Sequence, residues 1–335
     1  MRVLVTGASG FIGSVVARRL LADGSHVRCL VRRTSAIGRL PTAAVDLAYG
    51  DVRDAKAVER AVSGCDAVVH LACPSAWTAI RSPEMEAAVV AGTRHVLEAC
   101  VRRGARRVVY VSSVMAIGAS RRPQVLHEDS VSPEPLSRFV YVRAKRAAEG
   151  LCRRAAAHGL GAVIVNPGEV YGPGDTGLVT AGNLLDFARS SPVLACHGGV
   201  TVAHVDDVAE GIVSALERGR RGERYVLGGE NVTIRGLAAL TLELLGRDGR
   251  VITAPNALVR AAAWLGRTLR LPLPFEPEVV PYATLYWFMD NAKARRELGV
   301  SFRPARETLA STLAWLARAG HVSAPAAPAS REVRA

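Results

Sequence analysis

Lysine, aromatic residues, paired cysteines and long apolar runs are all scarce in this chain of 335 residues. The six cysteines are scattered without a Cys-x-x-Cys pair, which argues against a metal site or a disulfide framework and is typical of reduced, buried thiols. Arginines interrupt the apolar segment 261–274, so no stretch approaches the ~20 residues that cross a bilayer. From Met1 the chain enters an apolar strand directly. We therefore expect no signal peptide, no membrane partner and a cytoplasmic location.

The positive charge of the chain comes almost entirely from arginine. Only Lys56, Lys145 and Lys293 are lysines among 43 basic residues, and the formal net charge is +13. The arginines are dispersed, and aromatic residues, 5% of the chain, do not alternate with them as single-strand binding requires. We therefore expect a solvated basic surface and no nucleic-acid partner.

Short β-branched runs alternate with helical patterns in the first half of the chain. This alternation predicts βαβ units and an α/β fold, a doubly wound parallel sheet of the Rossmann type. The predicted strands are 2–5, 26–31, 48–50, 67–71, 107–111 and 162–165, and the predicted helices are 11–22, 54–63, 83–102 and 139–157.

Longer helical patterns with fewer strands follow Pro173. They cover residues 207–217, 234–245, 258–269 and 306–318. We expect a Rossmann domain over 1–173 and a smaller, mainly helical substrate-binding domain over 174–320, with one or two strands returning to the main sheet. The Ala/Pro/Ser-rich end, 321–335, is expected to be disordered.

Three glycines lie between the first predicted strand and the first predicted helix: Gly7, Gly10 and Gly13. In this context the first glycine permits a tight turn, the second lets a pyrophosphate approach the backbone, and the third lets the helix pack on the sheet. The free N–H groups at the helix start then bind the anionic pyrophosphate. The turn predicts a dinucleotide site.

The end of the second strand bears on the choice between NAD and NADP. It reads Leu30-Val31-Arg32-Arg33-Thr34, with two guanidinium groups and no carboxylate. An acidic residue here would bind the ribose 2′-hydroxyl, whereas arginine accommodates a 2′-phosphate. NADP is therefore expected over NAD, although chance placement explains the pair too, since arginine is so common in this chain.

Tyr141 and Lys145 are four residues apart in a predicted helix and so lie on one helix face. An ammonium beside a phenol favours the phenolate, so we expect Lys145 to lower the pKa of Tyr141 from about 10 and make it a general acid or base. Ser112 and Ser113 follow the strand 107–111, at the sheet edge where open α/β folds bind ligands. A surface lysine and ordinary turn serines are the alternative explanations.

Taken in order along the chain, these features resemble the extended short-chain dehydrogenase/reductase family. Within it the chain is most similar to the dihydroflavonol-reductase-like and hopanoid-associated sugar epimerase branch, on residues 222–231 and 292–299. The wider resemblance rests on Thr6-Gly7-Ala8-Ser9-Gly10-Phe11-Ile12-Gly13, Gly50-Asp51-Val52-Arg53-Asp54, His70-Leu71-Ala72, Gly92-Thr93, Val111-Ser112-Ser113, Tyr141-x-x-x-Lys145, Pro167 with Tyr171-Gly172-Pro173-Gly174, and His204-Val205-Asp206-Asp207-Val208-Ala209.

The resemblance implies a catalytic triad of Ser113, Tyr141 and Lys145. It places Asp51 and Val52 near adenine, Ala72 near the ribose-phosphate and Pro167 beside nicotinamide. It makes His204 and Asp206 structural, with Asp206 capping the next helix, and homodimers through the Tyr141 helix are common in the family. The full set of implied cofactor-binding residues is Gly7, Ser9, Gly10, Phe11, Ile12, Gly13, Arg32, Arg33, Asp51, Val52, Leu71, Ala72, Tyr141, Lys145, Pro167 and Val170.

Two positions depart from the family's pattern. Val89 stands where an asparagine is common, three residues before Gly92, and Glu169 stands where nucleotide-sugar enzymes commonly carry another asparagine. A carboxylate facing a diphosphate is repulsive. Both departures argue against a nucleotide-sugar substrate.

The favoured function is an NADP(H)-dependent oxidoreductase that reduces a carbonyl or oxidises the matching alcohol, with Tyr141 as general acid/base. The alternatives are a sugar epimerase or dehydratase that transfers hydride transiently, and a non-catalytic NADP(H)-binding sensor or scaffold. Trp77, Tyr171, Tyr286 and Trp287 fit an apolar substrate pocket, and core packing explains them equally well.

Overall fold

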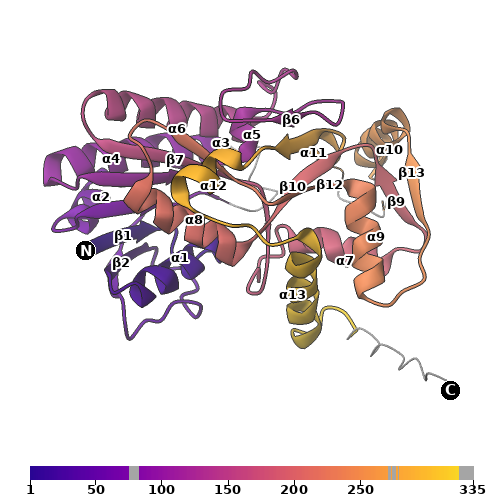
Figure 1. Ribbon diagram of the computed structural model, residues 1–335, viewed down its shortest axis with the longest axis horizontal. Helices are drawn as coiled ribbons and strands as arrows, with labels where there is room; N and C mark the ends of the chain where they lie inside the picture. The colour runs from indigo at the N-terminus through magenta and orange to yellow at the C-terminus, as the bar shows by residue number, and fades with distance from the viewer. Residues whose placement is uncertain (75–82, 271–272, 274–276, 278, 324–335) are drawn as a thin grey trace.

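The computed structural model describes residues 1–74, 83–270, 273, 277 and 279–323 (Figure 1). A seven-stranded sheet in the order β11-β7-β5-β4-β1-β2-β3 forms its centre, and every neighbouring pair is parallel. All six strands predicted for residues 1–173 belong to it. The strands are β1 (Arg2–Thr6), β2 (His26–Val31), β3 (Asp46–Tyr49), β4 (Ala67–His70), β5 (Arg107–Val111), β7 (Gly161–Pro167) and β11 (Arg224–Leu227).

Helices cover both faces of this sheet, as the near-continuous burial of its strands requires. On one face lie α1 (Phe11–Ala22) and α8 (Val205–Arg218), which pack against each other. The other face carries α2 (Ala55–Val62), α4 (Gly92–Arg103) and α6 (Val140–Ala157). The predicted Rossmann-type α/β fold is therefore confirmed.

The chain contains more strands than its pattern predicts, and most of them lie in its second half. A five-stranded sheet joins β12 (Glu230–Thr233), β10 (Gly199–His204) and β14 (Tyr286–Met289) to β6 (Val125–Leu126), with β8 (Glu169–Tyr171) paired to β10; β6 and β8 come from the first 173 residues. A separate pair joins β9 (Val193–Cys196) and β13 (Val251–Ala254). Of the strands after Pro173, β11 is the one that returns to the main sheet, beside β7.

Short and long helices complete this half of the chain, with α7, α9 and α10 on the right of Figure 1 and α12 beside α8. None of the helices in the described part of the chain is long and apolar enough to cross a membrane. The helices are α7 (Ala181–Arg189), α9 (Ile234–Leu244), α10 (Asn256–Leu269), α11 (Val280–Ala283), α12 (Ala292–Leu298) and α13 (Ala305–Arg318).

The helix predicted over residues 83–102 is one continuous run built from three different segments. These are α3 (Pro83–Glu86), a π-helical turn at Ala87–Ala91 and α4. Val89, at the position where the family commonly has asparagine, lies in the π-helical turn and is buried. Single π-turns inside helices are frequently found beside functional sites.

Candidate active site

The carboxyl ends of four central strands bring the predicted site residues together. Thr6 of β1 is in register with His70 of β4, His70 with Tyr110 of β5, and Val111 with Val165 of β7. The residues that follow these strands are therefore neighbours at one edge of the sheet, where open α/β folds bind their ligands.

The glycine turn has the geometry that a dinucleotide phosphate needs. Gly7 has φ +73°, and a Cβ there would lie 2.8 Å from the amide nitrogen of Ala72. Gly10 is the N-cap residue of α1 and has no side chain to cap the helix. The first N–H groups of α1 are thus open to an anion, and Leu71-Ala72 lies against the turn. These residues fit a dinucleotide without rearrangement.

A buried hydrogen-bonded chain holds Leu71 and Ala72 in place. His70 Nδ1 is 2.6 Å from Thr6 Oγ1, and His70 Nε2 is 3.2 Å from Thr93 Oγ1. Because Thr93 donates its proton to Val89 O at 2.6 Å, its oxygen accepts from Nε2–H, and Nδ1 accepts from Thr6. Burial, aided by Lys145, lowers the pKa of His70 to about 3, so the ring stays neutral. The sequence motif contained His70, but its role was missed.

Arg32 and Arg33 directly follow β2 and are both exposed. The Arg33 guanidinium lies 5.2 Å from the ring centre of Tyr49, whereas Arg32 remains near Asp51 and contributes to lowering its pKa. The larger cause of that lowered pKa is Arg53, whose Nη2 donates to Asp51 Oδ2 at 2.8 Å. Arg32 is thus the more available of the two predicted phosphate ligands.

Val52 and the loop after Ile37 add two contacts at this end of the site. Val52 packs where a side chain on Gly92 would collide with it. Arg39 donates to Ser9 O and to Gly174 O, both at 2.8 Å, and so ties the glycine turn to the loop after Tyr171. Sequence reasoning missed Arg39, because an isolated arginine in a loop gives no periodic signal.

Ser113, Tyr141 and Lys145 occupy the same region of the sheet edge. Ser113 is the N-cap of α5 (Val114–Ile117), where its Oγ accepts from Met115 N at 3.2 Å, and it also hydrogen-bonds to Tyr141. Lys145 is buried and its Nζ donates to Val111 O at 2.8 Å. Its Nζ is 5.7 Å from the ring centre of Tyr141.

The expected lowering of the Tyr141 pKa by Lys145 is wrong for this structure. Burial raises the pKa of Tyr141 well above its ordinary value, and Cys73 and Tyr282 act in the same direction. The hydrogen bond with Ser113 is the contribution that lowers it. Tyr141 is therefore a protonated phenol, which suits proton donation.

The surroundings of Tyr141 are apolar and come from distant segments. Cys73 Sγ lies 3.7 Å from Met85 Sδ, and Phe139 packs on Tyr282 with ring centres 4.5 Å apart. Tyr282 comes from α11, 141 residues later in the chain than Tyr141, and no sequence pattern identified it. Such walls suit an apolar carbonyl substrate.

The aromatic residues predicted for a substrate pocket are core residues where the structure describes them. Tyr171 is fully buried, and Trp287 is buried with its Nε1 donating to Tyr282 O at 3.0 Å. Tyr286 is also buried, with its ring against Phe288. Trp77 lies outside the described residues.

The segment after β7 carries the remaining predicted residues. Pro167 ends β7 at the sheet edge, and Val170 is buried in β8, where its carbonyl accepts from Thr180 Oγ1. Between them, Glu169 Oε1 accepts from Tyr171 Oη at 2.6 Å and from Asn183 Nδ2 at 2.8 Å. Burial raises the pKa of Glu169, against the lowering effect of these two hydrogen bonds.

The helix cap expected at Asp206 is formed by its neighbour instead. His204 is the N-cap of α8, and its Nδ1 accepts from Asp206 N at 3.1 Å. His204 Nε2 also contacts Ser311 Oγ at 3.1 Å. His204 thus caps α8 and contacts α13, whereas the Asp206 side chain is largely exposed and lies 3.5 Å from His204 Nδ1.

Comparisons with known proteins agree with this geometry. A putative dihydroflavonol 4-reductase of Synechocystis sp. is 33% identical over 328 residues, covering 95% of each chain. A 4-hydroxy-2-methyl-3-oxo-4-farnesyl-3,4-dihydroquinoline-1-oxide ketoreductase of Stigmatella aurantiaca is 32% identical and covers 97% of this chain and 99% of its own.

Solved structures of the same fold include sugar-nucleotide enzymes. A nucleoside-diphosphate-sugar epimerase from Pseudomonas aeruginosa superposes with a TM-score of 0.79 at 30% identity, over 96% of this chain and 99% of that one. A dTDP-glucose 4,6-dehydratase from Streptomyces venezuelae, solved with NAD bound, gives 0.76 at 26% identity, over 95% and 97%.

A family model also matches this chain. It is that of the NAD dependent epimerase/dehydratase family, and it matches residues 3–228, which include the glycine turn, Ser113, Tyr141 and Lys145. Members of this family are NAD(P)-dependent oxidoreductases of the extended short-chain dehydrogenase/reductase type, and this chain belongs to it.

Proposed function

We propose that the protein is an NADP(H)-dependent carbonyl reductase with Ser113, Tyr141 and Lys145 as its catalytic residues. The observation that carries the proposal is the partly buried, protonated Tyr141, hydrogen-bonded to Ser113 and walled by apolar side chains at the cofactor edge of the sheet. The reductases among the relatives support the same direction of reaction.

In this mechanism the residues of the chain position and protonate a carbonyl oxygen. Ser113 Oγ–H and Tyr141 Oη–H donate to that oxygen, and Tyr141 gives it a proton as the carbonyl carbon is reduced. Bound nicotinamide supplies the hydride. Tyr141 then regains its proton from solvent. The net reaction converts the carbonyl, NADPH and one proton into the alcohol and NADP⁺. Lys145, fixed by Val111 O, supplies positive charge beside the tyrosine and would help to hold the cofactor ribose.

Arg32 is proposed as the ligand of the NADP 2′-phosphate. It is exposed beside Asp51 at the end of β2, whereas Arg33 is engaged by Tyr49. The substitution Arg32→Gln should weaken NADPH binding by about ten- to a hundredfold, the range of one charged hydrogen bond, and leave NADH binding unchanged. Calorimetric titration with both cofactors measures this, with Arg33→Gln as the matched control. NAD that survives purification, or equal effects on both cofactors, would overturn the assignment.

A sugar epimerase or dehydratase is the second candidate, favoured by the superposition on sugar-nucleotide enzymes. Glu169 argues against it, because a carboxyl group replaces the neutral amide common beside the diphosphate. The discriminating experiment is a turnover screen of apolar ketones against nucleotide sugars, with wild-type protein and Glu169→Asn. Ketone reduction by the wild type supports the proposal, whereas nucleotide-sugar turnover by the wild type favours the second candidate. The six free thiols fit the reducing cytoplasm, where we place the enzyme.

A further inference from the structure

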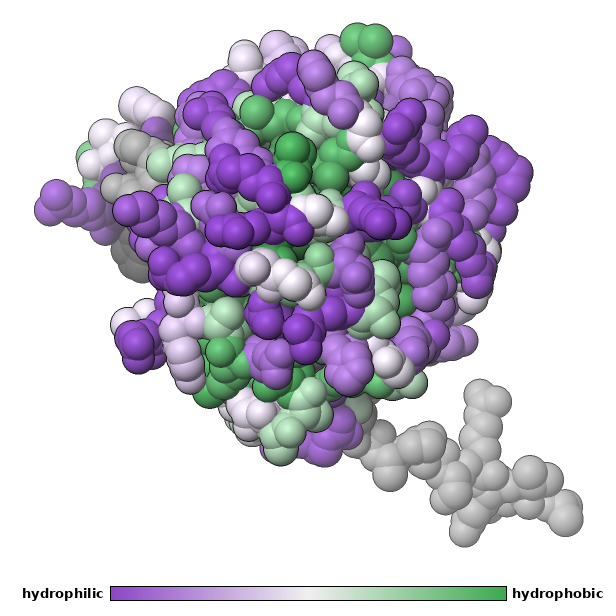
Figure 2. All heavy atoms as spheres, turned by 90° about the vertical axis from the view of Figure 1, so that its left-hand side faces the viewer, coloured by the Kyte–Doolittle hydropathy of each residue, from purple (hydrophilic) through white to green (hydrophobic). Residues whose placement is uncertain are grey.

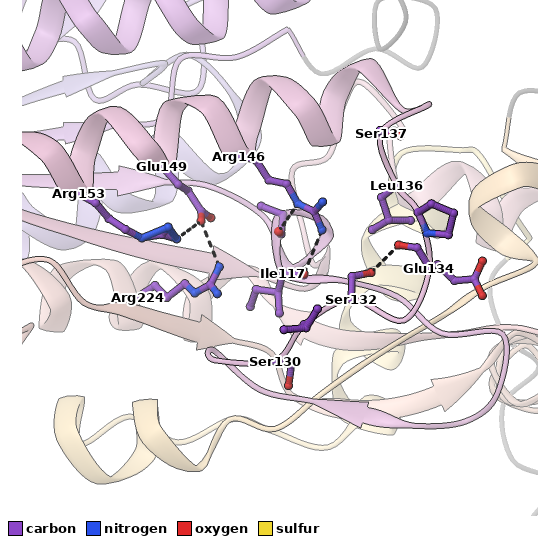
Figure 3. Close-up of a pocket in the computed structure, with 13 residues that line it drawn as sticks. Ile117, Ser130, Ser132, Glu134, Leu136, Ser137, Arg146, Glu149, Arg153 and Arg224 are labelled. Atoms are coloured by element: carbon purple, nitrogen blue, oxygen red, sulfur yellow. Dashed lines mark hydrogen bonds and ion pairs between the residues drawn. The ribbon is translucent and has the colours of Figure 1, made fainter.

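A second cavity lies beside α6 and is lined by residues other than those of the candidate active site. Its volume is about 490 Å³, and its walls come from α6, α5, the start of β11 and the loop 130–137 (Figure 3). Ser113, Tyr141 and Lys145 do not line it. This volume falls within the range of small-molecule pockets.

Guanidinium groups dominate the charge of this cavity. Figure 3 shows Arg153 and Arg224 converging on Glu149, whose Oε2 accepts from Arg153 Nη2 at 2.9 Å and from Arg224 Nη1 at 3.3 Å. Arg146 donates to two backbone carbonyls and meets no carboxylate among these contacts. The other lining acid, Glu134, is paired with Arg121 at 3.1 Å.

The wall is therefore positively charged overall. The single negative charge of Glu149 is shared by the guanidinium groups of Arg153 and Arg224 and balances only one of their two positive charges. One positive charge therefore remains on this pair, and Arg146 carries another. Guanidinium groups bind phosphate through parallel N–H donors and are weakly hydrated. The serine-bearing loop on the opposite wall adds polar groups of the kind that orient such a ligand.

Glu149 also connects this cavity to the catalytic serine. Its Oε1 accepts from Asn166 Nδ2 at 2.8 Å, and the same amide group donates to Ser113 O at 2.8 Å. Glu149 and Asn166 are both almost completely buried. An anion that draws Arg153 or Arg224 away from Glu149 Oε2 changes the charge that Oε1 presents to Asn166, and hence the hydrogen bond to Ser113.

We propose that this cavity is a second site, for a small phosphate-bearing metabolite, and that its occupancy is transmitted through Glu149 and Asn166 to the backbone of Ser113. Arg146, Arg153 and Arg224 bind the phosphate group. Neither half of the proposal depends on the reaction proposed above, and each can be tested without turnover.

Binding is tested by calorimetry of the full chain with inorganic phosphate, in cofactor-free and NADP-saturated protein. The substitution Arg153→Gln should weaken binding at least about tenfold, as the loss of one charged hydrogen bond predicts. Arg154→Gln, the next residue on α6, removes the same charge outside this cavity and should bind phosphate as the wild type does. Equal losses in the two variants, no binding at all, or binding abolished by NADP would overturn the site.

Transmission is tested by NMR on isotope-labelled protein. The peptide unit between Ser113 and Val114 accepts the Asn166 hydrogen bond through its carbonyl, so its carbonyl ¹³C and the Val114 amide resonances report on that bond. Saturating phosphate should shift both resonances in the wild type and in Arg154→Gln. The shifts should be clearly smaller in Arg153→Gln at the same phosphate concentration, because weaker binding leaves a larger fraction of that variant unoccupied. Unmoved resonances in phosphate-saturated wild-type protein would overturn the connection to Ser113.

Discussion

The hydroxyl groups of two tyrosines near Lys145 are in opposite situations. Tyr141 hydrogen-bonds to Ser113, whereas Tyr110 Oη is buried with no hydrogen-bond partner among the described residues. The Lys145 ammonium is 5.2 Å from the ring centre of Tyr110 and 5.7 Å from that of Tyr141, so charge alone does not separate them. Only Tyr141 is placed as a proton donor.

Removal of each hydroxyl should therefore have a different effect. Tyr141→Phe should lower kcat by about 10²–10⁴-fold, the range for loss of a general acid. Tyr110→Phe removes a buried polar atom without a partner, so it should leave kcat unchanged and keep or raise the free energy of unfolding. Steady-state kinetics and urea unfolding measure both. Equal losses of activity in the two variants would show that Tyr141 acts by packing.

The raised pKa of Tyr141 has a predictable pH dependence. Carbonyl reduction needs the protonated phenol, which persists below a pKa raised above its ordinary value of about 10, so kcat should stay level through about pH 9 and fall only above it. The hydrogen bond with Ser113 lowers this pKa, so Ser113→Ala should raise it and move the alkaline fall to higher pH.

Ser112 provides the matched control for this pH profile. Its Oγ is buried without a partner in the described structure, so Ser112→Ala should leave the profile where it is. A profile displaced equally by both substitutions would show that Ser113 does not act on the Tyr141 phenol. A fall in kcat that begins near neutral pH would contradict the raised pKa.

At the scale of the element, the turn between β1 and α1 depends on backbone geometry more than on side chains. Gly7→Ala puts a residue with a Cβ into the left-handed region, at a cost of about 1–2 kcal/mol in the free energy of unfolding. It also places that Cβ against Ala72 N. Gly24→Ala has nearly the same φ, +78°, with open space around its Cβ, so it should cost only the conformational part. Gly7→Ala should therefore lose most of its cofactor affinity, and Gly24→Ala should keep it.

Thermal unfolding and calorimetric cofactor titration separate these two effects. The stability loss common to both variants is the conformational cost, and the excess in Gly7→Ala is the collision with the Leu71-Ala72 segment. If Gly24→Ala lost cofactor affinity as well, general destabilisation of the fold, and not the loss of the glycine turn between β1 and α1, would explain the result.

The elements that could be predicted are those marked by a pattern in their own stretch of sequence. The strands of the main sheet are β-branched runs bounded by turn residues, and α1 begins and ends at its predicted residues because Gly10 and Asp23-Gly24 mark its limits. The strands β8, β12 and β14 have three or four residues and pair only with distant segments, so no local pattern reveals them. Tyr282 and Arg39 escaped prediction for the same reason, since tertiary packing alone brings them to the site.

At the scale of the whole molecule, one groove offers a surface for self-association. It lies between α4 and α6, has a volume of about 400 Å³, and is lined by Leu97, Val101, Leu151 and Ala155 with charged residues around them. The side of the molecule that carries α4 in Figure 1 faces the viewer in Figure 2, where apolar side chains are visible between hydrophilic ones. Val101 is 68% exposed, so its apolar side chain is available for contact with a second copy.

We propose that two copies associate through this groove as an isologous dimer, since a two-fold axis pairs the same apolar patch on both subunits. The wild type should then show twice the monomer mass in light scattering, and Val101→Glu should give a monomer, because it places a charge at the centre of the interface. Val131→Glu is the matched control, since Val131 is 90% exposed and lies outside the groove. Because α6 carries both the groove and Tyr141, the monomeric variant should also lose part of its thermal stability at low protein concentration. A monomeric wild type, or a dimer that Val101→Glu leaves intact, would assign this groove to another role.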